Sequence, residues 1–207
     1  MSVLTHFQLY DLLNRPRPLW LVKVDLSDLV LISADLSQCN LSLANLSRSD
    51  LNWIDLTRAN LTKANLSLAN LFEGNLSEAC LEGANLTHCN LTRANLTKAI
   101  LKEANLIEAN LSRAILTKAI ITNANLNLAN LSRIDLSKSD CSNSNFSNAD
   151  LYKANLFEAN LTNANLNGVN LTGADLTAAN LSGADLTDAI LTNADLTDAI
   201  LPDSMIK

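Results

Sequence analysis

One pattern of five residues governs most of this sequence. A small residue, usually Ala, is followed by Asn or Asp, then Leu, then a polar residue and a variable one, as in residues 59–63, Ala-Asn-Leu-Thr-Lys. The pattern keeps its register without insertion from residue 24 to residue 201, and its central position departs from Leu only at Ile121, Cys141 and Phe146. A period this strict over this length leaves few folds open.

Neither regular secondary structure accommodates a period of five. In an α-helix successive leucines would move about 140° around the axis, so no apolar stripe would form. In a straight strand an odd period sends successive leucines to opposite faces. The leucines can share one side only if the chain turns after each short extended piece, so the period predicts a solenoid.

The composition of each position predicts its direction. If the central Leu is position i, the small residue at i−2 and the Leu at i are expected to point inward. Asn or Asp at i−1, Ser or Thr at i+1 and the variable residue at i+2 are expected to face solvent or the corners. Asn and Asp suit corners because their short side chains form hydrogen bonds with nearby backbone groups.

The repeats at residues 24–201 match the A(D/N)Lxx signature, and the chain therefore resembles the pentapeptide-repeat proteins, in particular cyanobacterial members. The resemblance implies an all-β fold, a right-handed, four-sided parallel β-helix with about 20 residues per coil and about nine coils in this chain. We expect three segments: an N-terminal cap at 1–23, the β-helix at 24–201 and a C-terminal tail at 202–207.

The two ends of the repeat region differ in sequence. In residues 2–14 apolar side chains recur at roughly helical spacing, and Pro16 and Pro18 then stop a helix, which predicts a short capping helix followed by an extended segment. The tail is too short to cover the last coil. That coil is either blunted by Pro202 and nearby acidic residues or paired with a second copy in an end-to-end homodimer.

Composition argues against several classes of function. The net charge of −6 does not suggest a general nucleic-acid binder. The two histidines and four cysteines lack the spacing of a nucleophile, a redox pair or a zinc site, and no glycine-rich phosphate loop is present. No apolar run spans a membrane, and no basic segment followed by an apolar run opens the chain. We expect a soluble, cytoplasmic, non-enzymatic protein without cofactor or metal.

Stacked coils would turn the variable i+2 positions into columns of residues 20 apart. Two adjacent columns gather seven cations, and three nearby repeats carry Ile in place of Asn or Asp at i−1, an unusual choice for a solvated corner. Two interpretations stay open: a solvated wall with improved β packing, or a surface for an acidic partner protein. The candidate partner-binding residues are Arg93, Lys98, Ile100, Arg113, Ile115, Lys118, Ile120, Arg133, Lys138 and Lys153.

The resemblance to the pentapeptide-repeat proteins implies several classes of function. Some relatives are interaction modules, including cyanobacterial regulators of cell differentiation, and a protein-interaction scaffold is our first hypothesis. The alternatives are a DNA mimic that binds a type II topoisomerase such as gyrase, as other relatives do, and direct nucleic-acid binding by the basic columns. The basic central faces depart from the acidic surface that a mimic needs. Stacked acidic pairs such as Asp175 with Asp195 lack a third ligand and make a poor Ca²⁺ site.

Overall fold

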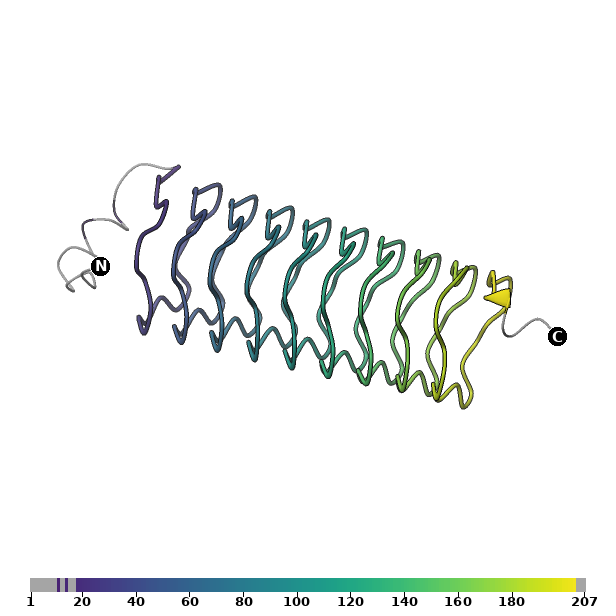
Figure 1. The fold of residues 1–207 in the computed structure, drawn as a ribbon. Coiled ribbons are helices and arrows are strands. Elements are labelled where there is room, and N and C mark those ends of the chain that lie inside the picture. Colours follow the sequence, from purple (N-terminus) through teal and green to yellow (C-terminus); the bar gives the residue numbers. More distant parts are fainter. Residues whose placement is uncertain (1–10, 12–13, 15–17, 204–207) are drawn as a thin grey trace.

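The described part of the computed structural model, residues 11, 14 and 18–203, forms a rod of stacked coils that advances along the axis from its purple to its yellow end (Figure 1). Parallel bridges join residues 20 apart, from Trp20 with Asn40 to Asn180 with Ile200. Four repeats therefore complete one coil. Within residues 18–203 the coils pair only through these single-residue bridges, and no longer strand forms. The expected capping helix falls almost wholly outside the described residues, of which Asp11 is helical.

Backbone hydrogen bonds repeat with the sequence. The Leu96 N–H donates to the Ile115 carbonyl of the next coil at 2.7 Å, and the Asn95 N–H donates to the Gly74 carbonyl of the previous coil at 2.9 Å. Each coil is thus bonded to both neighbours in a parallel register. These bonds satisfy the polar groups of a backbone that a narrow rod could not otherwise bury.

Each corner is a β-turn that begins at the central Leu. The Ala64 N–H donates to the Leu61 carbonyl at 2.9 Å across residues i+1 and i+2, and the i+2 residue Lys63 has a φ of 54°. A positive φ at the third turn residue alone is typical of a type II turn. The corners therefore lie at i+1 and i+2, whereas Asn or Asp at i−1 occupies the bridge. The expectation that i−1 is a corner position is wrong.

The Asn and Asp side chains still reach the corner from their bridge positions. The Asn95 Oδ1 accepts from the Thr97 N–H at 3.1 Å, and many repeats form the same contact. The amides also stack: Asn85 Nδ2 donates to Asn65 Oδ1, and Asn65 Nδ2 donates to Asn45 Oδ1, both at 3.1 Å. Side chains at i−1 thus brace both the turn and the contact between coils.

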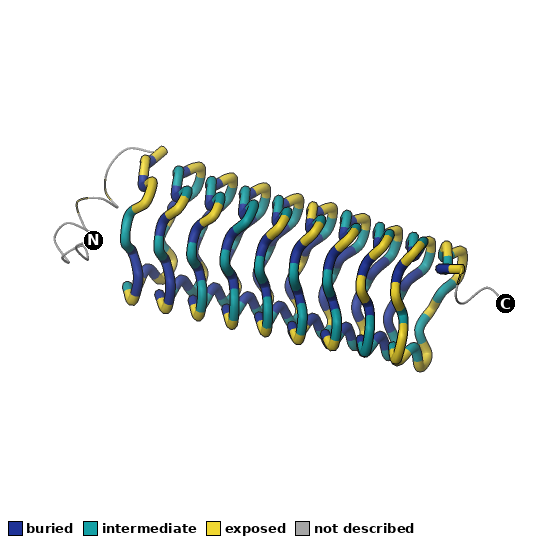
Figure 2. The backbone as a smooth tube through the Cα atoms, in the orientation of Figure 1, coloured by how far each residue is buried: buried dark blue, intermediate teal, exposed yellow. Residues whose placement is uncertain are grey.

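The interior consists of the residues at i and i−2, as the sequence predicted. The exceptional central residues Ile121, Cys141 and Phe146 are fully buried like the leucines around them. Figure 2 shows buried backbone positions lining the inside of the coils, with exposed positions at the corners. Burial weakens in the last coil, where Leu186, Leu191 and the central leucines that follow are only partly buried.

Candidate partner-binding surface

The bridges confirm that residues 20 apart form columns along the rod. Ile100 bridges Ile120, as predicted, and the bridges on each coil place the i+2 side chains in line. We call the side that carries Trp53, Glu73, Arg93, Arg113 and Arg133 at i+2 the arginine face. The next side, which carries Glu78, Lys98, Lys118, Lys138 and Glu158, is the lysine face.

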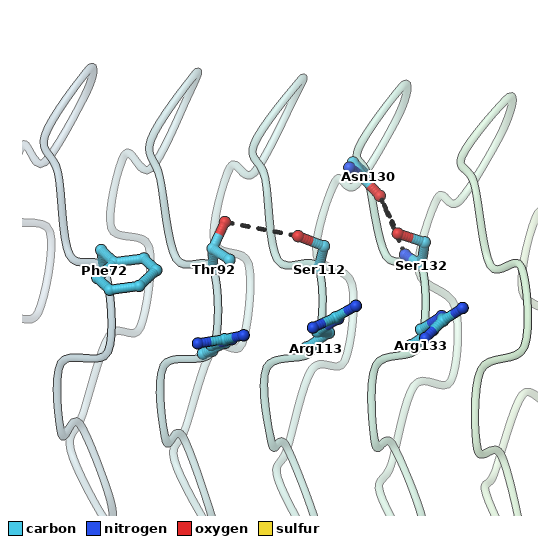
Figure 3. A pocket seen from close by; sticks show the side chains of 8 residues that line it. Phe72, Thr92, Ser112, Arg113, Asn130, Ser132 and Arg133 are labelled. Atoms are coloured by element: carbon cyan, nitrogen blue, oxygen red, sulfur yellow. Dashed lines mark hydrogen bonds between the residues drawn. The ribbon is translucent and has the colours of Figure 1, made fainter.

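An open groove of about 560 Å³ lies on the arginine face. Figure 3 shows Arg113 and Arg133 on successive coils with their guanidinium groups arranged in a row, beside the small hydroxyl side chains of Ser112 and Ser132. The groove is lined by Phe72, Thr92, Arg93, Ser112, Arg113, Asn130, Ser132 and Arg133. Three of the ten candidate residues thus share one concave surface.

The N-terminal end of the arginine row is held by a hydrogen-bonded chain. Arg93 Nη1 contacts Glu73 Oε1 at 3.0 Å, and Trp53 Nε1 donates to Glu73 Oε2 at 3.0 Å. The guanidinium of Arg93 and then the indole of Trp53 lower the pKa of the Glu73 carboxyl. These contacts fix the orientation of Arg93 while leaving half of its side chain exposed.

The lysine face has a similar arrangement at both ends. Lys98 Nζ lies 3.9 Å from Glu78, and Lys138 Nζ lies 3.6 Å from Glu158. Lys138 also lies over the ring of Phe157, at 5.7 Å from the centroid. Glu158 and Glu78, the latter shared with Arg58 at 2.8 Å, therefore partly neutralise the lysines at the two ends of this run.

The central cations of the arginine and lysine faces differ from the cations at the ends of these faces. Among residues 11, 14 and 18–203, no carboxylate lies within ion-pair distance of the exposed side chains of Arg113, Lys118 and Arg133. Some other cations lie opposite a carboxylate on a neighbouring coil, as Arg48 and Asp28 do at 2.6 Å, although acidic residues also stack, as Asp175 does on Asp195. Like charges in register destabilise a sheet, so the stacking of these central cations costs free energy.

The isoleucines lie apart from the groove. Ile115 and Ile120 are 44% and 42% exposed, while Ile100 is half-buried. Ile115 lies on the lysine face between Asn95 and Asp135, and Ile100 and Ile120 lie one side further on. Because i−1 is a bridge position, where β-branched side chains fit well, Ile there is not the anomaly that a solvated corner would make it.

Three exposed apolar residues and the half-buried Phe72 group on the arginine face, and sequence reasoning did not identify this group. Val30 is 68% exposed, Ile32 44% and Trp53 52%, and all precede the arginines on the same side of the rod. The ring of Phe72 packs edge-on against Trp53, with centroids 6.1 Å apart. Reading sequence columns at intervals of 20 on this one side would have found the group.

Other chemistry is sparse within the described residues. They contain no group of three His, Cys, Asp or Glu side chains that could hold a metal, and none of their helices has the length and apolar character needed to cross a membrane. Cys39, Cys80, Cys89 and Cys141 form no disulfide with one another. Burial raises the pKa of Cys141 to about 12, so this thiol is unreactive at neutral pH. The remaining candidate, Lys153, lies over the Tyr152 ring at 5.3 Å.

The chain is similar in sequence to a family of known proteins. The family model described as Pentapeptide repeats matches residues 20–48, 49–87, 89–127, 129–168, 154–193 and 164–203. Among curated proteins no match was found. The solved structure of HetL, a pentapeptide repeat protein involved in heterocyst differentiation regulation from the cyanobacterium Nostoc sp. strain PCC 7120, is 37% identical, with 89% of this chain and 90% of HetL covered and a TM-score of 0.39.

Two further solved structures show weaker likeness. Rfr23, a pentapeptide repeat protein from the cyanobacterium Cyanothece 51142, is 32% identical, with 57% of this chain and 88% of Rfr23 covered and a TM-score of 0.27. QnrB1, a plasmid-mediated fluoroquinolone resistance protein, is 22% identical, with 84% of this chain and 83% of QnrB1 covered and a TM-score of 0.35.

Proposed function

Since the chain belongs to the pentapeptide-repeat family, we propose that it is a non-enzymatic interaction module that binds an acidic partner protein through the arginine and lysine faces. Membership implies a right-handed β-helix, whose rigid coils hold exposed side chains at a fixed spacing. Such a rod provides a binding surface, and any catalytic activity belongs to its partner. A regulatory role follows if binding alters the activity of that partner.

The observation that carries the proposal is the run of cations at Arg113, Arg133 and Lys118, which no carboxylate in the described part of the chain pairs with. A column of stacked like charges costs free energy in the isolated rod, whereas Arg48 lies opposite Asp28 on the neighbouring coil and avoids this cost. An acidic partner would neutralise the run and recover that free energy on binding. Charge complementarity of this kind accelerates association and selects against basic competitors.

The alternatives have less support. A DNA mimic must present acidic faces, and the groove on this rod is lined by three arginines instead. Direct binding of nucleic acid by these cations is opposed by the net charge of −6. A gyrase supercoiling assay tests the DNA-mimic alternative, because a mimic inhibits the enzyme or protects it at stoichiometric concentrations.

The proposal is tested by affinity capture from an extract of the source cells. The bait is the wild-type chain or the double variant Arg113→Glu/Arg133→Glu, and the control is Arg48→Glu, which reverses a cation on another side of the rod. We expect a partner whose capture falls at least about tenfold with the double variant and is unchanged with the control. Equal capture by all three baits would refute the proposed surface.

The last coil supports a second proposal, end-to-end pairing of two copies. Leu186, Leu191 and Leu196 are only partly buried there, so a second copy would complete the burial of their side chains. Sedimentation equilibrium of wild type and Leu191→Asp tests this pairing. A dimer that the substitution converts to monomer supports it, and a monomeric wild type at about 100 µM contradicts it.

A further inference from the structure

The arginine face changes character along the rod axis. Its N-terminal half presents the apolar side chains of Trp53 and Phe72, and its central part presents Arg93, Arg113 and Arg133. Glu73 lies between the two parts and is held there by Trp53 and Arg93. A complementary partner must therefore carry apolar residues at one end and acidic residues at the other.

The spacing of the coils limits the shape of that partner. Side chains on successive coils lie about 4.8 Å apart, so the two intervals from Arg93 to Arg133 span about 9.6 Å. An extended peptide along the axis repeats its facing side chains every 6.8 Å or so, which misses by about 4 Å over the same span. An α-helix repeats its facing side chains about every 5.4 Å and misses by only about 1.2 Å.

Flexible arginine side chains can absorb a mismatch of this size. The Thr92 and Ser132 hydroxyls already donate to Asn90 Oδ1 at 2.7 Å and Asn130 Oδ1 at 2.8 Å, so Ser112 is the groove hydroxyl that can donate to a carboxylate held by the guanidinium groups. The Thr92 and Ser112 hydroxyls already lie 3.5 Å apart, with no bulky side chain between them. A helix lying in the groove would meet the guanidinium donors of Arg93, Arg113 and Arg133 along its length.

We propose that the arginine face binds a partner α-helix that lies parallel to the rod axis. Its acidic residues at i, i+4 and i+7 contact Arg93, Arg113 and Arg133, and its apolar residues at i−3 and i−7 contact Phe72 and Trp53. Four coil intervals span about 19 Å, and the fourteen residue steps of such a helix span about 21 Å. This inference rests on the proposed function and names the shape of its partner.

Glu73 sets the register of the bound helix. An acidic residue over the Glu73 carboxylate would be repelled, so the acidic part of the helix is excluded from the apolar end of the face. A helix shifted by one turn toward the N-terminal end would place its first carboxylate at Glu73. The face therefore distinguishes a helix with segregated apolar and acidic parts from one that is acidic throughout.

A defined peptide tests the proposal. The probe is a fluorescent helix of about 15 residues with Leu at i−7 and i−3 and Glu at i, i+4 and i+7, locked by a hydrocarbon crosslink on its far side. One control peptide has the same composition with the Glu residues distributed around the helix, and another contains prolines that keep it extended. A short DNA duplex of matched charge is the third competitor. Binding is measured by fluorescence anisotropy to the full chain.

We expect the locked helix to bind at least about tenfold more tightly than each control. The double variant Arg113→Glu/Arg133→Glu should lose this affinity, Phe72→Ala should weaken it severalfold, and Arg48→Glu should leave it unchanged. Equal binding of the scrambled or extended peptide, preference for the duplex, or no binding of the helix overturns the inference. If the capture experiment still finds an arginine-dependent partner, only the helical shape fails and the proposed function stands.

Discussion

Replacing Arg113 with Gly should stabilise the rod while removing a binding residue. Arg113 has a φ of 59° at the third residue of its turn, where Gly83 and Gly173 have φ values of 63° and 66° at equivalent positions. A side chain in this left-handed region costs about 1–2 kcal/mol. Gly avoids that cost but loses about 0.5–1 kcal/mol through the greater entropy of the unfolded chain. The two magnitudes leave a net gain of about 0 to 1.5 kcal/mol, centred near about 0.75 kcal/mol.

Charge adds to this gain. Arg113 lies between Arg93 and Arg133 on neighbouring coils, so its removal also relieves like-charge repulsion, which added salt screens. For a chain of this size we expect the melting temperature to rise by about 1–4 °C. Thermal unfolding followed by circular dichroism, at low and high salt, measures the effect.

Arg48→Gly is the matched control. Arg48 has the same turn conformation, with a φ of 57°, but its guanidinium contacts Asp28 at 2.6 Å. The control therefore gains the same backbone relief and loses a favourable ion pair. We expect Arg113→Gly to stabilise more than Arg48→Gly at low salt, with the difference shrinking at high salt. If Arg48→Gly stabilises as much or more at low salt, the arginine row carries no electrostatic cost and our argument for a partner fails.

Three further predictions concern the rod itself. Leu96→Ala should cost about 2–5 kcal/mol in urea unfolding because Leu96 is fully buried, whereas Leu128→Ala, at a half-exposed corner, should cost far less. Asn65→Ala should cost about 1–3 kcal/mol by breaking the amide stack, and an unchanged urea midpoint would refute the role of that stack. The hydroxyl of Thr187 lowers the pKa of Asp185 below 3.8, so the stability from this contact is present above that pH and is lost as pH falls through the lowered pKa. Thr187→Val should return the pKa toward 3.8 in a carboxyl NMR titration, and no change would contradict the assignment.

A solenoid was predictable because a strict period leaves one way to bury every central residue, and the resemblance to the pentapeptide-repeat family supplied the 20 residues per coil that define its columns. The stacking of Ile100 on Ile120 followed from counting 20 positions along the chain. The position of the corners did not follow, since residues such as Lys63 adopt a positive φ without the Gly that usually indicates such a turn. Asn at i−1 indicated a corner instead. Its side chain does accept a hydrogen bond from the corner backbone, but the residue itself lies at the neighbouring bridge.

The groove could be predicted only in part. The cations that line it were visible as a column, but its hollow depends on the small Ser112 and Ser132 in the next column, between the larger Phe72 and Tyr152. Which cations are neutralised depends on the conformations of long side chains, and a sequence does not specify these. The Glu73 carboxylate, for example, binds both Trp53 and Arg93 and leaves the later arginines unpaired.

Arginine footprinting of the captured complex shows whether Arg113 and Arg133 contact the partner. Phenylglyoxal modifies exposed guanidinium groups, and mass spectrometry compares modification of the free and the bound chain. We predict that Arg113 and Arg133 are modified in the free chain and protected in the complex, while Arg48 is modified equally in both. Equal modification of Arg113 and Arg133 with and without the partner would contradict this contact.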